Sequence, residues 1–492
     1  TIYNKKSAGK MKLEGERLGK EVMLKLEEGN YKGAIRRLCS EDTIAPMSLE
    51  TLEALKNKNP AAPPNKRPSK PPDPSGTVLH TETTQVRAAV FSFPQGSSGG
   101  LDGLTPQHLK DLIRIGGDSS PLLHNLTALV NIMLRGKIPQ SVHEIFFGGR
   151  LIALNKKDGG IRPIVIGNTY RRIGSKVACQ HATQALSTLF GHTQVGVGIK
   201  GGMEAAVHAT RRYLENLPDN HVVVKLDFKN AFNTVRRDVI LEEVLRLVPS
   251  IYPFVYSAYS SPSTLSFNGK IIQSSEGVHQ GDPLGPILFC LAIHPVLQRC
   301  QTELTIAYLD DVTLGGPLEV IGEEVARIRD EGREIGLELN NNKCELIHGE
   351  FQPISIELES FCKVHRMEAM LLGSPLLEGT SVSVVLKSKC DALQRMASKL
   401  NILQAHDALT ILRHSLSLPS LLHVLRTSQC TNHPLLQEFD NQLKDCLSDL
   451  LNVSLDELRW RQASLPVRAG GLGMAIITSG SICLPGISSH DF

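Results

Sequence analysis

The sequence predicts a protein of the α+β class. Strand and hairpin patterns are confined to the middle of the chain, and helical periodicity of the apolar residues dominates on either side. The chain has 492 residues, of which 41% are hydrophobic and 21% are charged, as in ordinary folded proteins. This length suggests about three domain-sized units. The same numbers exclude a wholly disordered chain, a collagen-like chain and a small disulfide scaffold.

Helices and loops are expected before residue 140. Apolar residues recur at helical spacing over residues 10–58, where Ser48 is a candidate N-cap. Residues 59–76 contain seven prolines and several basic residues, which predicts a stiff, extended linker. The Gly/Ser-rich stretch 94–103 predicts a loop, and helical patterns follow it.

Three hairpin patterns and one buried strand make up the middle of the chain. The first hairpin is FFGGRLIALNKKDGGIRPIVIGN, the second turns at Asn268-Gly269, and the third, LTIAYLDDVTLGG, turns at its acidic pair. HVVVKLDF, residues 221–228, predicts the buried strand. Helices are expected at residues 170–190, 201–216, 234–247, about 283–300 and 319–336, and over most of the chain after residue 380.

The net charge of +3 conceals an uneven distribution. Residues 110–225 carry a net charge of +8, whereas residues 226–492 carry −9. A basic surface that holds phosphates, beside acidic residues gathered where a metal binds, would produce this pattern. Random drift of charge along solvated faces would also produce it, so composition alone leaves both explanations open.

Cysteine spacing and hydropathy indicate an intracellular protein. The ten cysteines form no CxxC pair, and no His or Cys cluster has zinc-ligand spacing. We therefore expect free thiols in a reducing compartment. No apolar run reaches the roughly 18 residues of a membrane-spanning helix, so no membrane partner is expected. The weak basic cluster Lys66-Arg67 and Lys70 leaves the nucleus open, and the start at Thr1 suggests a fragment or a decayed copy.

Asp227 and the pair Asp310-Asp311 are the candidate metal ligands. Asp227 ends the predicted strand, and the pair follows an apolar run. Carboxylates at the ends of neighbouring buried strands would concentrate like charge, which a divalent cation relieves. Aspartate oxygens are hard ligands suited to Mg²⁺. Ordinary turn chemistry is the competing explanation for each residue taken alone.

Several blocks in order decide between these explanations. LDFKNAFNTV, EGVHQGDPLGPILF and AYLDDV resemble motifs A, B and C of the reverse transcriptases, most closely those of non-LTR retrotransposons. LIALNKKDGGIRPIVIGNTYRRIGSK resembles the fingers segment of that family, and GLELNNNKCEL and MLLGSPL resemble motifs D and E. The resemblance is strong over roughly residues 99–376, and ASLPVRAGGLGM at residues 463–474 is similar to segments downstream of such domains.

This resemblance implies a right-hand polymerase fold, with fingers, a palm built on an antiparallel sheet, and a helical thumb. The implied activity is that of an RNA-directed DNA polymerase, which extends a DNA primer with dNTPs on an RNA template. The domains expected are a helical N-terminal extension (1–58), a proline-rich linker and connector (59–98), fingers and palm (99–376), a thumb-like helical region (377–475) and a tail (476–492).

The resemblance also implies roles for the residues of the metal site. Asp227 and Asp310 would be the principal ligands of two Mg²⁺ ions, with Mn²⁺ as the alternative ion. The carbonyl of Phe228 would complete one metal shell, and Asp311 would lie next to the primer end. Lys343 matches the motif D lysine, a candidate general acid toward pyrophosphate.

Five further residues match positions that hold the incoming nucleotide. Lys156 and Arg162 would bind the triphosphate, and Phe232 would be the steric gate that rejects a 2′-hydroxyl. Gln280 would touch the nucleotide or the template, and Gly281 would let the chain pass close to the substrate.

Three basic residues, Arg171, Arg172 and Lys176, are expected to face the phosphates of the template. The motif C block departs from the commonest form of this group, because Leu309 stands at a variable position where Ala is frequent. No metal ligand is replaced, and we therefore expect an active enzyme. The alternatives are a truncated, catalytically silent remnant that only binds nucleic acid, and a polymerase that copies RNA into RNA.

Overall fold

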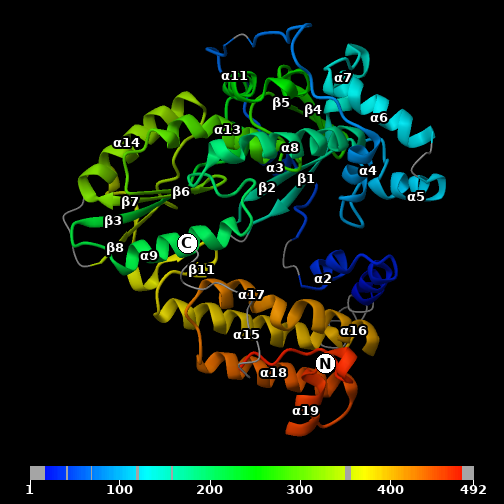
Figure 1. The fold of residues 1–492 in the computed structure, drawn as a ribbon, viewed down its shortest axis with the longest axis vertical. Coiled ribbons are helices and arrows are strands. Elements are labelled where there is room, and N and C mark those ends of the chain that lie inside the picture. Colours follow the sequence, from blue (N-terminus) through cyan, green and yellow to red (C-terminus); the bar gives the residue numbers. More distant parts are fainter. Residues whose placement is uncertain are drawn as a thin grey trace. The chain divides into compact units, whose positions relative to one another are not determined.

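The computed structural model describes residues 17–39, 43–67, 69–117, 121–156, 159–349 and 356–478. The chain forms two compact units. The larger unit comprises residues 42–206 and 217–364, and the smaller unit comprises residues 1–41, 207–216 and 365–492. Helices and mainly antiparallel sheets occur together (Figure 1), so the predicted α+β class is confirmed.

The larger unit holds two sheets and the helices that cover them. Ser48, the predicted cap, accepts a hydrogen bond from the Thr51 amide in the first turn of its first helix. The helices are α3 (Leu49–Lys58), α4 (Thr83–Phe91), α5 (Pro106–Gly116), α6 (Pro121–Leu134), α7 (Gln140–Phe147), α8 (Thr169–Phe190), α10 (Ala231–Thr234), α11 (Arg237–Leu247), α12 (Tyr252–Tyr259), α13 (Gly285–Gln298) and α14 (Leu318–Glu334). The strands are β1 (Gly149–Asn155), β2 (Ile161–Gly167), β3 (His221–Leu226), β4 (Ser263–Phe267), β5 (Lys270–Ser274), β6 (Leu304–Tyr308), β7 (Asp311–Pro317), β8 (Glu345–His348) and β9 (Cys362–His365).

The five-stranded sheet has the strand order β6-β7-β3-β8-β9. β3 lies in its centre and is antiparallel to both β7 and β8. Val222, Val223 and Val224 are all buried, as expected of a central strand that is covered on both faces. α14 packs on β3 and β7 (Figure 1), and apolar residues of α11 and α13 belong to the same core.

The four-stranded sheet has the order β2-β1-β4-β5 and contains the first two predicted hairpins. β1 and β2 are antiparallel over their whole length. At the turn between β4 and β5, Asn268 and Gly269 have positive φ angles of 48° and 77°, as a type I′ turn requires. Both hairpins are confirmed, although Lys157 and Asp158 at the tip of the first lie outside the described residues.

Residues 43–58 belong to the larger unit, although the sequence grouped them with the rest of an N-terminal extension. β1 pairs with β4 only at its first two residues, so the later part of that side is free to pair. The Ala45 amide donates to the Ala153 carbonyl there, at 2.9 Å. Leu55 of α3 is buried in one cluster with Leu151. Backbone pairing and apolar burial therefore fix α3 beside the β1–β2 hairpin.

The described part of the proline-rich segment forms neither helix nor strand. It is nevertheless fixed to the larger unit, because Arg67 contacts α11 twice. Its backbone amide donates to Asp238 at 2.8 Å, and its guanidinium donates to Glu242 at 2.9 Å. The segment is therefore held along α11 instead of forming a free spacer.

The smaller unit is mainly helical, as predicted for the end of the chain. α15 and α18 pack against each other in its core (yellow and orange in Figure 1). Arg211, in the part of α9 that belongs to this unit, donates to the carbonyls of Leu376, Pro375 and Thr427. Its elements are a helix at 17–27, α2 (Tyr31–Cys39), most of α9 (Gly202–Glu215), β10 (Met370–Leu371), β11 (Ser374–Pro375), α15 (Thr380–Leu400), α16 (Ala405–Ile411), α17 (Leu418–Thr427), α18 (Pro434–Leu451) and α19 (Glu457–Ser464).

The nine cysteines among the described residues are free thiols, as predicted, and Cys483 lies outside them. Within the same residues, no helix combines the length and the apolar character needed to cross a bilayer.

Candidate active site

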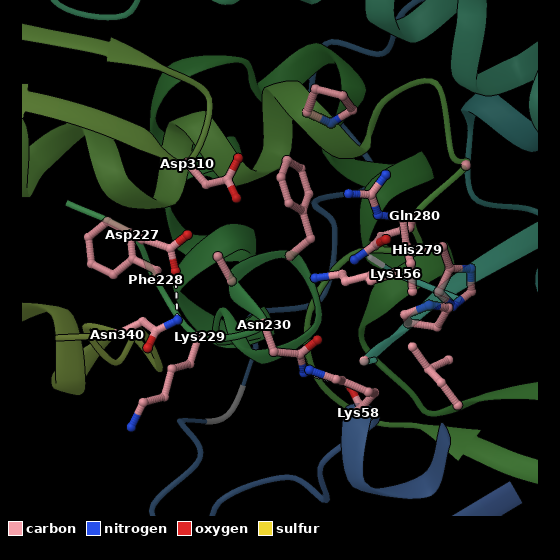
Figure 2. Close-up of a pocket in the computed structure, with 18 of the residues that line it drawn as sticks. Lys58, Lys156, Asp227, Phe228, Lys229, Asn230, His279, Gln280, Asp310 and Asn340 are labelled. Atoms are coloured by element: carbon pink, nitrogen blue, oxygen red, sulfur yellow. Dashed lines mark hydrogen bonds between the residues drawn. The ribbon is translucent and has the colours of Figure 1, made fainter. Parts of the chain in front are cut away.

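One cavity of about 960 Å³ in the larger unit brings together ten residues that the sequence singled out. Five segments contribute them: the end of β3 with the short α10 that follows it, the β6–β7 turn, the β1–β2 hairpin, and the turns before α13 and before β8. Figure 2 shows Asp227 and Asp310 on one side of the view and Lys156 and Gln280 on the other. The ten residues are Asp227, Phe228, Asp310, Asp311, Lys343, Lys156, Arg162, Phe232, Gln280 and Gly281.

The register of the five-stranded sheet places the three carboxylates at one edge. Asp227 directly follows β3, and Asp311 is the first residue of its antiparallel partner β7. β6 pairs with β7 up to Tyr308 opposite Asp311, which leaves Leu309 and Asp310 as a two-residue turn at the same edge. Three residues from two distant segments therefore meet because two strand ends coincide.

Burial and neighbouring carboxylates raise the pKa of both Asp310 and Asp311. Burial and then the charge of Asp227 raise the pKa of Asp310, although its own backbone and the cations Arg162 and Lys156 oppose this. Asp311 reaches solvent. Burial of part of its carboxyl, together with the charges of Asp310 and Asp227, nevertheless raises its pKa from 3.8 to about 6. The Asp310 and Asp311 carboxyl groups are therefore harder to ionise than a solvated aspartate.

The donor chemistry suits a hard divalent cation, although the protein ligands are not preassembled around one. Within the described residues, no three His, Cys, Asp or Glu side chains are gathered closely enough to hold an ion by themselves. Mg²⁺ usually binds through one or two carboxylates and shares its remaining shell with water and substrate phosphates. Asp227 and Asp310 on one cavity wall therefore fit Mg²⁺ that arrives with a phosphate ligand.

Asp227 is held in place by the segment that precedes β8. The Asn340 side chain donates to its Oδ1 at 3.0 Å (dashed in Figure 2), and the Asn340 amide donates to its carbonyl at 2.8 Å. The Asp227 amide in turn donates to Sγ of Cys344 at 3.4 Å. The sequence singled out only Lys343 in this block, and Asn340 was missed although it stands in the same Asn-rich run.

Phe232 lines the cavity and is half-buried. Its ring stacks on that of Phe289 in α13, with the centroids 4.7 Å apart and the planes at 24°. Packing against a buried ring limits the rotation of the Phe232 side chain. A rigid, bulky ring in the wall of the cavity is what a steric filter needs.

Gln280 and Gly281 are positioned by the β1–β2 hairpin. The Gln280 carbonyl accepts from the Val165 amide at 2.8 Å, and its side chain donates to Asn233 at 2.9 Å. Gly281 has a φ of 125°, and a Cβ there would lie 2.4 Å from the Val165 carbonyl oxygen. The close approach that requires glycine is therefore to β2 itself.

Three cationic residues predicted for the site lie exposed at the cavity. Lys156 follows β1 and Arg162 is in β2, so both stand near the tip of one hairpin. Lys343 lies in a turn in which its amide donates to the Asn340 carbonyl at 2.8 Å. Lys58, the last residue of α3, also lines the cavity (Figure 2). Nothing in its sequence context pointed to this, because pairing of residues 43–45 with β1 brings it there.

The prediction that Arg171 faces template phosphate is not supported by the structure. Its side chain is only 2% exposed and forms an ion pair with Asp282, with 2.9 Å between nitrogen and oxygen. Its guanidinium also bonds Nδ1 of His279 at 2.9 Å and the Phe147 carbonyl. The side chain projects from the buried face of α8, so it braces the segment around Gln280 from behind.

Arg172 and Lys176 also lie outside the cavity lining. Both are half-buried, and their charged groups lie over the ring of Phe93, at 5.3 and 4.7 Å from its centroid. Burial lowers the pKa of Lys176. Their contacts with a phosphate therefore stay a prediction that the cavity does not support.

Comparison with known proteins agrees with this geometry. Residues 154–376 match the family described as reverse transcriptase (RNA-dependent DNA polymerase). This range contains all ten cavity residues, including the three carboxylates. This chain carries a reverse transcriptase domain of the non-LTR retrotransposon type.

Similar curated proteins are encoded by retrotransposable elements. The chain is 25% identical over 396 residues to the SLACS 132 kDa protein of Trypanosoma brucei gambiense, and the match covers 77% of this chain and 32% of that protein. It is 25% identical over 318 residues to the R2 Pol polyprotein of Bradysia coprophila, covering 58% and 33% of the two chains. The chain thus spans about a third of the length of these relatives.

Solved structures of telomerase share a distant likeness. The apo telomerase of Candida tropicalis has a TM-score of 0.37 and 11% identity, over 64% of each chain. The telomerase of Candida albicans has a TM-score of 0.35 and 11% identity, over 64% of this chain and 60% of that one.

Replacing Asp311 by asparagine should stabilise the metal-free protein at neutral pH. The folded-state pKa of Asp311 lies above its ordinary value, so the folded state loses stability as the pH rises from about 4 to about 6. Solvent screening keeps the effect modest, and we expect Asp311→Asn to raise the melting temperature by about 2–4 °C at pH 7.5 in EDTA. Thermal unfolding at pH 4 is the control, because the difference should vanish there. An equal difference at both pH values would contradict the electrostatic cause.

Replacing Arg171 by methionine should destabilise the fold strongly. The substitution leaves the buried Asp282 carboxylate without its cation, and loss of one partner of a buried pair costs about 3–5 kcal/mol. Urea unfolding followed by circular dichroism measures the change. Arg150→Met, at an exposed arginine of β1, is the matched control and should change the stability by less than about 0.5 kcal/mol. Equal stability of both variants would contradict the buried ion pair and favour a solvent-facing Arg171.

Proposed function

We propose that this chain catalyses RNA-directed DNA synthesis by two-metal nucleotidyl transfer. The observation that carries the proposal is the single cavity lined by ten residues that five separate segments contribute. The family match supports the reaction type. The substrates are an RNA template, a DNA primer and dNTPs.

Asp227 and Asp310 would hold two Mg²⁺ ions, with the Phe228 carbonyl as a further ligand and Asp311 beside the primer end. When bound, such ions activate the attacking primer hydroxyl and stabilise the leaving pyrophosphate. The raised pKa values of Asp310 and Asp311 support this role, because burial and then neighbouring carboxylates disfavour the charged forms that a bound cation would stabilise. Asn340 keeps Asp227 oriented, since it occupies one of its oxygens.

The opposite wall would bind the nucleotide. Lys156 and Arg162 would hold the triphosphate, whose negative charge they complement. Phe232 would exclude a 2′-hydroxyl, and Gln280 would contact the nucleotide or the template strand. Lys343 lines a smaller hollow together with Asp227 and Asp311 and would give a proton to the departing pyrophosphate.

The helical region 377–475 would act as the thumb and hold the template–primer duplex through its backbone. Such contacts are largely independent of sequence and weaken as salt is added. Priming on chromosomal DNA would place the protein in the nucleus.

Asp310→Ala should abolish primer extension. Loss of a principal metal ligand should reduce kcat by at least about a thousandfold, the upper end of the loss for one stabilising group. Incorporation of labelled dNTPs on an RNA template with Mg²⁺ measures it, and fluorescence anisotropy should show template–primer binding unchanged. Asp330→Ala, at an exposed aspartate of α14, should extend normally. Retained extension by Asp310→Ala would refute the metal role, and a wild-type protein that binds without extending would support the silent remnant.

Phe232→Ala should relax selection for the sugar. Removing the ring opens space for the 2′-hydroxyl, and we expect the preference for dNTP over rNTP, as a ratio of kcat/KM, to fall about tenfold or more. Phe232→Tyr keeps the bulk and should keep the preference. Unchanged selectivity in Phe232→Ala would remove the gate assignment, and a wild-type preference for rNTPs would favour RNA synthesis.

A further inference from the structure

The turn that carries Asp310 contains a strained residue. Leu309 is the first of the two residues between β6 and β7 and has a φ of 59°. A two-residue hairpin turn with positive φ at this position usually has glycine there. A leucine in the left-handed region clashes with its own backbone, so surrounding contacts must hold it.

Gln194 supplies these contacts. Its side chain is almost fully buried and forms hydrogen bonds with both the amide and the carbonyl of the Leu309 backbone. Its Oε1 accepts from the Leu309 amide at 2.8 Å, and its Nε2 donates to the Leu309 carbonyl at 3.1 Å. Oε1 also accepts from the Gly196 amide at 3.2 Å. Two donors meet at Oε1, so the amide has a single orientation that satisfies all partners.

The segment that carries Gln194 is itself fixed to the hairpin. It runs beside β6, where the Val195 amide donates to the Ala307 carbonyl at 2.9 Å. The Ala307 amide donates in turn to the Thr193 carbonyl at 2.6 Å. A Cβ on Gly196 would lie 2.8 Å from the Leu309 nitrogen, so only glycine allows this approach. The residues before and after Gln194 are therefore fixed to β6 by backbone hydrogen bonds.

We propose that Gln194 is a positioning residue, which holds the left-handed Leu309 turn and thereby keeps the Asp310 carboxylate in the cavity. Gln194 is not one of the described residues that line the cavity, so it acts on the site indirectly. Its effect passes through one peptide unit, because Asp310 follows Leu309 directly. The effect of Gln194 on catalysis rests on the proposed function. Its effect on the conformation of the turn rests on the strained Leu309 alone.

Gln194→Met removes all three hydrogen bonds of the side-chain amide and keeps the side-chain length. We expect kcat for primer extension to fall about a hundredfold, the scale of a misplacement of about 1 Å at a reacting group, while KM for dNTP changes less than about threefold. Gln184→Met, at an exposed glutamine of α8, is the matched control and should extend like the wild type.

Leu309→Gly separates positioning from general damage. Glycine adopts the left-handed conformation without strain, so the turn needs the clamp less. The fold reduction of kcat that Gln194→Met causes should therefore be at least about ten times smaller in the Leu309→Gly background than in the wild type. Equal losses in both backgrounds, or full activity of Gln194→Met, would overturn the proposal.

Thermal unfolding tests the contact of Gln194 with the Leu309 turn without measuring activity. It compares the wild type, Gln194→Met, Leu309→Gly and the double variant. Gln194→Met should lower the melting temperature less in the Leu309→Gly background than in the wild type. If the wild type extends no primer, the proposed function fails, yet this comparison still supports the clamp. Equal melting shifts in both backgrounds would refute the clamp even if the enzyme is active.

Discussion

The antiparallel pairing of β3 with β7 is the constraint on which the site depends. It ends with Asp227 and Asp311 at the same edge of the sheet. The tight β6–β7 turn adds Asp310 at that edge. A shift of the pairing by one residue would turn every side chain of the strand to the opposite face. It would also take Asp227 out of register with Asp311, so the carboxylates meet only in the observed pairing.

The gathered charge explains much of what surrounds it. Burial, and then repulsion among the carboxylates, raises the pKa of Asp310 and Asp311. This cost is offset by features that other segments bring. Asn340 orients Asp227, and Lys156 and Arg162 place positive charge within reach of Asp310. The cavity thus has an acidic and a basic wall, which is the arrangement that a metal–phosphate substrate requires.

A buried polar network supports the basic side from behind. Arg171 ties α8 to His279 and Asp282, the two residues that flank Gln280 and Gly281. Its position shows how a basic residue in a basic segment can serve the site without touching substrate. The uneven charge that the sequence displays therefore combines cations of the cavity with cations that brace its walls.

The sequence by itself determined the α+β class, the three hairpins and the residue types of the site. Alternating apolar residues, an Asn-Gly turn and ordered sequence blocks are local signals, and each can be interpreted without knowing what lies nearby. Only the tertiary structure decided that Arg171 is buried, that Lys58 reaches the cavity and that Gln194 grips Leu309. These facts depend on contacts between segments separated by about a hundred residues, and the direction of a side chain across such a contact follows from packing. The division of the N-terminal helices between two units has the same cause, because the free side of β1 exists only once the sheet has formed.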